Sequence, residues 1–142
     1  MSGIPTGSGT EAIHSILLED VANTAKPLIT GVQYHIYTVI SITIHFIAAT
    51  TGEDFEIYLT GYDSTAGASG EKISILTLRD QTVRSTFVWN DKFSFNGFEP
   101  NTNTQIARAA QAGGAAQVLN VGSTNSGYKA DVTCTFIDQD WS

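Results

Sequence analysis

The feature that most constrains this chain is a two-residue alternation that runs from Tyr34 to Phe46. The even positions of this run are mostly aliphatic or aromatic, whereas the odd positions include His35 and Ser41. Such alternation in a segment rich in β-branched residues is typical of a half-buried β-strand. At about 3.3 Å per residue the run would exceed about 40 Å, which is long for one strand. We therefore expect either a bend near Thr38 or two strands in succession.

Shorter alternating runs follow the same period, with turn residues between them. They cover residues 55–59, 73–78, 83–89, 93–95 and 130–137, and a bulge is expected at Ile75–Leu76 because the apolar face changes there. An earlier apolar run from Ile13 to Leu18 is either an edge strand or one helical turn. This pattern predicts an all-β fold, an antiparallel β-sandwich or jelly roll.

The chain of 142 residues has the length of one domain. Residues 1–12, rich in glycine and carrying a proline, are expected to form a flexible N-terminal arm, with a single β-sandwich domain at residues 13–142. Residues 101–127 hold few bulky side chains and predict one long loop of the kind that is often ordered by a partner. Within it, a short helix at 104–112 and a short strand at 117–121 are expected.

The charge balance argues against two classes of partner. The formal net charge is −7, and the Lys and Arg residues are scattered rather than clustered. A nucleic-acid surface needs clustered cations to displace counterions from phosphates, and an acidic protein is repelled by anionic membranes. The apolar stretch at residues 39–49 is too short and too polar to span a bilayer, and the N-terminus has no signal-peptide pattern. We expect a protein made in a cytoplasm that binds neither nucleic acid nor membrane.

Candidate metal ligands and nucleophiles do not form a convincing set. Cys134 lies in an alternating run and is expected to be a small buried residue, since no cation or histidine lies beside it in the sequence. His35 and His45 would share an outer face but stand about 33 Å apart on an extended strand. No further histidine or cysteine at ligand spacing supports them. We expect no metal and no other cofactor.

Acidic side chains give no stronger indication of an active site. The stretches at residues 53–56 and 138–140 could offer oxygens to Ca²⁺, but neither has the spacing of a calcium loop, and a solvated turn is the better interpretation. The Gly-x-Ser-x-Gly motif and the phosphate-binding glycine loop are both absent from the sequence. Paired carboxylates from separate strands stay open at this stage. The sequence therefore predicts a protein without enzymatic activity.

Several aromatic residues gather near one expected hairpin, namely Phe87, Trp89, Phe93, Phe95 and Phe98. The simplest interpretation is that these side chains belong to the core between the two sheets of the sandwich. The alternative is that Trp89 or Phe98 is exposed for stacking on a sugar or for a subunit contact.

The order and the residue content of these segments resemble those of a known group of proteins. An Ala-Lys-Pro-Leu-Ile segment (residues 25–29) precedes the long alternating strand. Then come Ile-Tyr-Leu-Thr-Gly-Tyr-Asp-Ser-Thr-Ala-Gly-Ala-Ser-Gly-Glu (57–71), a Phe-Asn-Gly-Phe turn (95–98) and a strand that starts Lys-Ala-Asp-Val-Thr (129–133). Over residues 25–100 and 128–137 the chain resembles the small β-sandwich structural proteins of tailed bacteriophages, including capsid decoration (cement) proteins. The long segment at 101–127 departs from the short loops of that group.

The resemblance implies a non-enzymatic virion component on the outer capsid surface, a homotrimer that binds the major capsid protein. The expected contact residues lie in the arm, the long loop and the C-terminal tail: Ile4, Pro5, Ile13, Ile106, Arg108, Val118, Leu119 and Trp141. Two other functions stay open. One is a carbohydrate- or receptor-binding module that uses Trp89 and Tyr62, and the other is a tail or neck component of the virion.

Overall fold

The computed structural model describes residues 10–61, 72–97 and 116–140. Within these ranges the chain forms strands only: β1 (Thr10–Val21), β2 (Lys26–Thr30), β3 (His35–Ala48), β4 (Asp54–Thr60), β5 (Ile73–Arg79), β6 (Thr86–Trp89), β7 (Phe93–Asn96), β8 (Val118–Ser123) and β9 (Lys129–Asp140). The all-β prediction is confirmed. Of the described segments, none is a helix that could cross a membrane.

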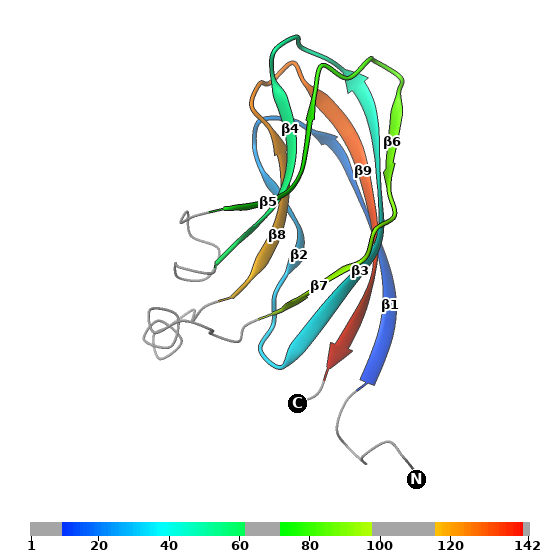
Figure 1. Cartoon of the computed structure of the whole chain (residues 1–142), viewed down its shortest axis with the longest axis vertical. Coiled ribbons are helices and arrows are strands. Elements are labelled where there is room, and N and C mark those ends of the chain that lie inside the picture. The colour runs from blue at the N-terminus through cyan, green and yellow to red at the C-terminus, as the bar shows by residue number, and fades with distance from the viewer. Residues whose placement is uncertain (1–9, 62–71, 98–115, 141–142) are drawn as a thin grey trace.

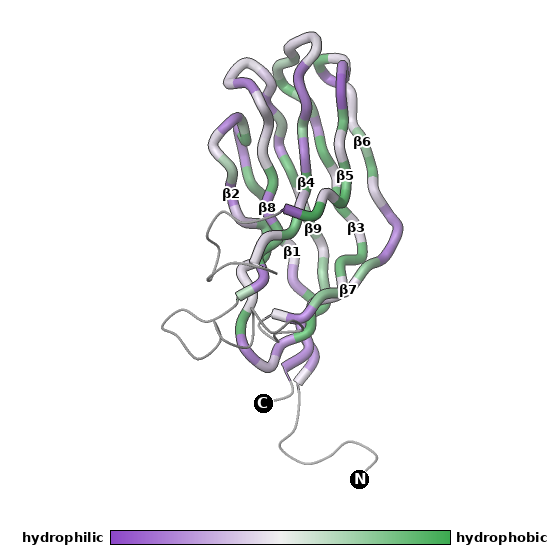
Figure 2. Tube along the Cα trace, turned by 60° about the vertical axis from the view of Figure 1, so that its left-hand side comes forward, coloured by the Kyte–Doolittle hydropathy of each residue, from purple (hydrophilic) through white to green (hydrophobic). Residues whose placement is uncertain are grey.

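The strands form two antiparallel sheets that face each other (Figure 1). Sheet A has the order β1-β9-β3-β6, with β7 also paired to β3, and sheet B has the order β2-β8-β4-β5. When β6 and β7 are counted as one position, this order is that of a jelly roll. Figure 2 shows the alternation of apolar and polar residues along the strands that a two-layer sandwich requires.

The core lies between the sheets and is closed by aromatic contacts. Phe46 from sheet A packs edge-on to Phe55 from sheet B, with ring centroids 5.4 Å apart, and Tyr128 packs against both rings. All three side chains are fully buried. The Tyr128 hydroxyl donates to the Leu78 carbonyl at 3.2 Å and accepts from the Gln81 amide at 3.3 Å. The buried phenol therefore has the partners that its polar atom needs.

The long alternating run is one strand, β3, that carries a bulge. The register with β9 shifts between Val39 and Ser41, so Ile40 has no opposite residue. The buried side chains change phase at the same place, from Tyr37 and Val39 to Ile42 and the even positions after it. The expectation of a bend near Thr38 therefore fits β3. The expectation that every even position faces the core is wrong before the bulge, because the extra residue exchanges the two faces.

The bulge expected at Ile75–Leu76 is confirmed by the register shift between β4 and β5. The hairpin expected around Trp89 is wrong. Strands β6 and β7 both pair with β3, one after the other on the same side, with residues 90–92 between them. They occupy the place of one interrupted strand. Phe98 lies outside the described residues.

The arm expected at residues 1–12 and the loop expected at residues 101–127 both overlap with strands of the structure. β1 begins at Thr10, so residues 10–12 pair with β9 rather than belonging to an arm. β8 occupies residues 118–123, close to the short strand expected at 117–121. The expected helix at 104–112 and residues 1–9 of the expected arm lie outside the described residues.

Candidate interaction surface

The outer face of sheet A carries a broad surface without charged side chains. The register of β1, β9, β3, β6 and β7 brings alternate residues of these strands onto one side of the sheet. We call this surface the neutral face, and define it by Ile13, Ser15, Leu17, Thr38, Ser41, Thr43, Val88, Ser94, Thr133, Thr135 and Ile137.

Hydroxyl groups connect neighbouring strands across the neutral face. Ser15 on β1 and Thr135 on β9 lie 3.1 Å apart, oxygen to oxygen, and Thr38 on β3 and Ser94 on β7 lie 2.9 Å apart. These side-chain hydrogen bonds stabilise cross-strand pairs and hold the polar groups close to the sheet. The polar atoms are therefore partly satisfied without water, which lowers the cost of covering them with another protein.

Aliphatic side chains stand exposed among the hydroxyls. Ile13 is 69% exposed, Leu17 is 54% exposed and Val88 is 57% exposed. The first two belong to β1, at one margin of the neutral face, and Val88 belongs to β6 at the other. Single exposed aliphatic residues are ordinary, but several on one uncharged sheet face are typical of a protein contact.

The outer face of sheet B has the opposite character. Arg79 on β5 donates to Asp54 on β4, with 2.8 Å between Nε and Oδ1. Lys72 lies 3.0 Å from Glu56 and 4.7 Å from the ring centroid of Tyr58. The Arg79 guanidinium, through its hydrogen bond and then its charge, lowers the pKa of Asp54. This side of the sandwich is a solvated, ion-paired surface, and the neutral face is the side suited to contact.

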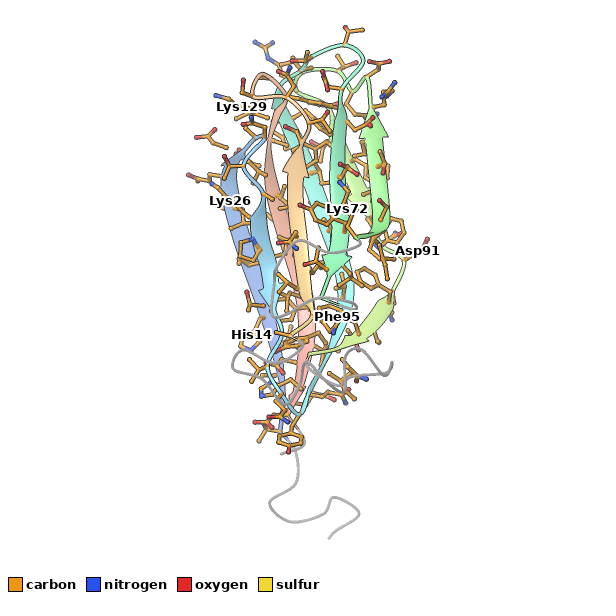
Figure 3. The ribbon with its side chains drawn as sticks, turned by 90° about the vertical axis from the view of Figure 1, so that its left-hand side faces the viewer. His14, Lys26, Lys72, Asp91, Phe95 and Lys129 are labelled. Atoms are coloured by element: carbon orange, nitrogen blue, oxygen red, sulfur yellow. The ribbon has the colours of Figure 1, made fainter. Side chains whose placement is uncertain are left out.

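A groove opens along one side of the sandwich, where the edge strands β1 and β2 lie next to each other. It has a volume of about 420 Å³ and is lined mainly by His14, Ile16, Leu28, Tyr37, Phe136 and Asp138. The ring of His14 packs on Phe136, with 5.5 Å between centroids. Figure 3 shows β1 and β2 along the same margin, with His14 and Lys26 towards its two ends. The groove is mainly apolar and open along its length.

The histidines do not form a metal site in the described part of the chain. His35 Nδ1 lies 2.7 Å from Asp138 Oδ1, and its Nε2 lies 3.6 Å from Asp140. His45 Nδ1 lies 2.8 Å from the Thr86 hydroxyl. The expectation that His35 and His45 share a face is wrong, because the bulge at Ile40 puts His35 on the core side of β3. Among the described residues, no group of three or more His, Cys, Asp or Glu side chains could hold a metal ion.

Other candidates for chemistry have structural roles. Cys134 is fully buried, and burial raises the pKa of its thiol to about 12, as expected for an inert core residue. The acidic turn at Glu53 and Asp54 is held by Thr124, whose hydroxyl accepts from the Asp54 amide at 2.9 Å and donates to Glu53 at 2.6 Å. These contacts hold the turn together.

The structure separates the expected contact residues into three sets. Ile13 lies exposed on β1 and belongs to the neutral face. Val118 and Leu119 are 7% and 0% exposed, because β8 is an interior strand of sheet B, and this corrects their assignment as contact residues. The remaining expected contacts, Ile4, Pro5, Ile106, Arg108 and Trp141, lie outside the described residues.

Most of the neutral face was missed by sequence reasoning. Leu17, Thr133, Thr135 and Val88 come from strands far apart in the chain, and only the register of β1 and β6 shows that they share a surface. The available signal was the hydroxyl-rich side of the alternating strands, which has the same sequence pattern on a solvated surface and on a contact surface.

Trp89 does not have the geometry of a sugar platform. It is half-buried against the core, and its indole Nε1 is buried without a hydrogen-bond partner among the described residues. A stacking tryptophan presents its ring face to solvent. Tyr62, the other residue of that alternative, lies outside the described residues.

No model of a known protein family matches the sequence, and no curated protein matches it. Solved structures with a similar fold exist at low identity. One is a protein of the Bacillus endospore appendages, which form disulfide-linked pili, at 14% identity, covering 100% of this chain and 98% of the other, with a TM-score of 0.45. A chain of the naturally occurring empty particles of cowpea mosaic virus has 11% identity, coverage of 92% and 83%, and a TM-score of 0.43. A chain of the infectious bursal disease virus Gx strain has 10% identity and a TM-score of 0.41, and this chain covers 33% of its length.

Proposed function

We propose that this protein is a non-enzymatic structural subunit of a virus particle, a decoration protein that binds the outer surface of the capsid through the neutral face of sheet A. The observation that carries this proposal is the contrast between the two outer faces. Sheet B carries ion pairs such as Asp54 with Arg79, whereas the exposed middle of sheet A carries only hydroxyl and aliphatic groups. The assignment to a virus head rests on the resemblance to phage decoration proteins.

The composition of the neutral face fits a flat protein contact. Hydroxyl groups such as those of Thr133 and Thr135 can exchange hydrogen bonds with a partner's backbone or with trapped water. Exposed aliphatic residues such as Leu17 supply apolar area without charges that must be stripped of water. Such a surface binds a partner that is itself neutral, and the acidic remainder of the chain faces outwards.

The mechanism of a decoration protein follows from mass action. A subunit that binds the expanded capsid lattice but not the unexpanded one stabilises the expanded state by RT ln(1 + [L]/Kd). No bond is made or broken in this mechanism. The trimer and the major capsid protein as partner are further parts of this proposal.

Co-sedimentation tests the proposal. Purified protein is mixed with expanded and with unexpanded capsid shells of the virus that encodes it, and the bound fraction is measured against protein concentration. We expect saturable binding to expanded shells only. Absence of binding to expanded shells, or equal binding to both, contradicts the decoration role.

A matched pair of variants assigns the binding to the neutral face. Thr133→Lys places a charge in the middle of that face, and Thr77→Lys places the same charge on the outer side of sheet B, opposite Glu56. Both threonines are exposed strand residues. We expect Thr133→Lys to weaken shell binding at least about tenfold and Thr77→Lys to leave it unchanged, with circular dichroism as the check of folding.

A tail or neck component is the second candidate. It would use the same neutral face but a different partner and ring symmetry. Labelling of intact particles with an antibody against the chain separates the two, because a decoration protein is spread over the head, whereas a connector marks one vertex.

A further inference from the structure

The edges of the two sheets are protected to very different degrees. A free strand edge exposes unpaired backbone groups, and proteins normally blunt it with short strands, proline, lysine or bulges. β2 has five residues and contains Lys26 and Pro27, and β5 has a bulge at Ile75. β6 and β7 have four residues each and are separated by a segment that contains Asp91 and Lys92. Three of the four edges are therefore blunted.

The fourth edge, β1, is protected only at its C-terminal end, where a bulge shifts the register with β9 between Leu18 and Val21. It has 12 residues without proline, glycine, lysine or arginine, and its register with β9 is regular from Thr10 to Leu18. Its carboxylates stand near its ends, at Glu11, Glu19 and Asp20. The segment Ala12–Leu18 between them is mostly apolar, and its two isoleucines are of the β-branched type that favours strands.

Both sides of β1 offer apolar contacts to an added strand. Ile13 and Leu17 point outwards, where they continue the neutral face. Ile16 and Leu18 point inwards and are only partly buried, and Ile16 lines the groove beside β2. A strand paired with β1 would bury residues on both faces as well as the free backbone groups.

We infer that the occupant of this edge is β1 of a second copy of this chain, paired antiparallel about a two-fold axis. A two-fold pairing brings identical strands together, so each uncharged Ala12–Leu18 segment meets its own equivalent. Each copy has a net charge of −7, so two copies repel each other over most of their surfaces. The middle of β1 carries no carboxylate, and there the two backbones can approach without bringing like charges together.

The regular part of β1 sets the register, because a pair centred on His14 joins all of Thr10–Leu18 to the second copy and sets no like charges opposite each other. When His14 lies opposite His14 of the second copy, Ile13 faces Ser15, Ala12 faces Ile16, and Glu11 faces Leu17. Centring the pair on Ser15 instead would place Glu11 opposite Glu19, and like charges directly opposite destabilise a sheet. The pair centred on His14 joins two copies of sheet A into one continuous sheet, and the two neutral faces become one wider surface.

Sedimentation velocity or native mass spectrometry over a range of concentrations tests this pairing with the full chain. We expect a monomer–dimer equilibrium. Leu17→Glu places a carboxylate opposite Glu11 of the second copy and should weaken dimerisation at least about tenfold, whereas Val88→Glu, at a similarly exposed residue on β6, should not. A chain that stays monomeric or forms trimers, or a dimer that Leu17→Glu leaves intact, overturns the inference.

Cysteine cross-linking gives a second readout that does not depend on affinity. In the proposed register the two His14 residues lie directly opposite, within the Cα separation that a disulfide spans. Under mild oxidation His14→Cys should form a covalent dimer, and Ser94→Cys on the β7 edge should not. Absence of the His14→Cys dimer overturns the pairing.

The proposed capsid binding is tested separately, since Thr133→Lys and shell co-sedimentation leave β1 unchanged. Failure of capsid binding therefore does not count against the dimer, whereas a dimer would replace the trimer that the resemblance to decoration proteins implies.

Discussion

The α-carbon of Gly97 lies against the backbone of Val32, so closely that a β-carbon on Gly97 would stand 2.2 Å from the Val32 carbonyl oxygen. The same place is tied by backbone hydrogen bonds, from the Gly97 amide to the His35 carbonyl and from the Gln117 amide to the Gly97 carbonyl, each 2.8 Å long. The end of β7, the start of β3 and the start of β8 are thus joined at one point.

Gly97→Ala should therefore destabilise the fold strongly. The new methyl group meets backbone atoms that cannot move without breaking these hydrogen bonds, and we expect a loss of about 3 kcal/mol or more in the free energy of unfolding. Gly52→Ala is the control. A β-carbon at position 52 would have open space around it, and adopting the φ of +81° there costs an alanine residue about 1–2 kcal/mol. Urea denaturation compares the two, and equal losses would contradict the close approach.

The second prediction concerns alkaline pH. Burial, with a smaller contribution from the charge of Asp138, raises the pKa of Tyr37 from 10.0 to about 12. The unfolded chain therefore loses this proton at a lower pH than the folded chain does, so the contribution of Tyr37 to stability is constant below about pH 10 and falls as the pH rises towards 12. Burial raises the pKa values of Tyr58 and Tyr128 in the same direction.

Tyr37→Phe checks the assignment. The variant lacks the ionising hydroxyl and the hydrogen bond of 3.1 Å from the Val32 amide, so it should be less stable at pH 8. Between pH 10 and pH 12 its unfolding free energy should fall less steeply than that of the wild type, by about 2 kcal/mol over the interval. Parallel pH profiles would show that Tyr37 is not the group responsible.

The third prediction is that Cys134 is unreactive in the native protein. Its side chain is fully buried, and its raised pKa leaves little thiolate at pH 8. We expect labelling by iodoacetamide to require global unfolding and to be slower by a factor of about 10³ or more than in urea. The variant Ser15→Cys, with an exposed thiol on β1, should gain one rapidly labelled site. Rapid native labelling of the wild type would mean that the core opens near β9.

The sequence predicted the strands well because burial alternates where one face of a strand packs on the core. It could not show where the alternation changes phase. Val39, Ile40 and Ile42 are all β-branched aliphatic residues, and only the pairing of β9 reveals that Ile40 is the unpaired one. The interruption between β6 and β7 was missed for a related reason, since Asn90 and Asp91 form a turn signal in a hairpin and in a broken strand alike.

The candidate surface was less predictable than the fold. Thr133 and Val88 are distant in sequence, and Thr43 of β3 lies opposite both of them in the register. Hydroxyl residues on the outer side of a strand have the same sequence pattern whether they face water or a partner. Val118 and Leu119 were assigned to a loop surface because small residues surround them, whereas the position of β8 between β2 and β4 buries both.

The last prediction tests the phase change in β3 directly. Val39 is fully buried, whereas Ile40 is only partly buried at the bulge. Val39→Ala should therefore cost about 2–3 kcal/mol of unfolding free energy, and Ile40→Ala, although it removes more carbon atoms, should cost about 1 kcal/mol or less. An uninterrupted alternation from Tyr34 to Phe46 requires the reverse order, because it would place Ile40 in the core and Val39 outside. Urea denaturation of the two variants decides between them, and a larger loss for Ile40→Ala would mean that β3 runs through without the bulge.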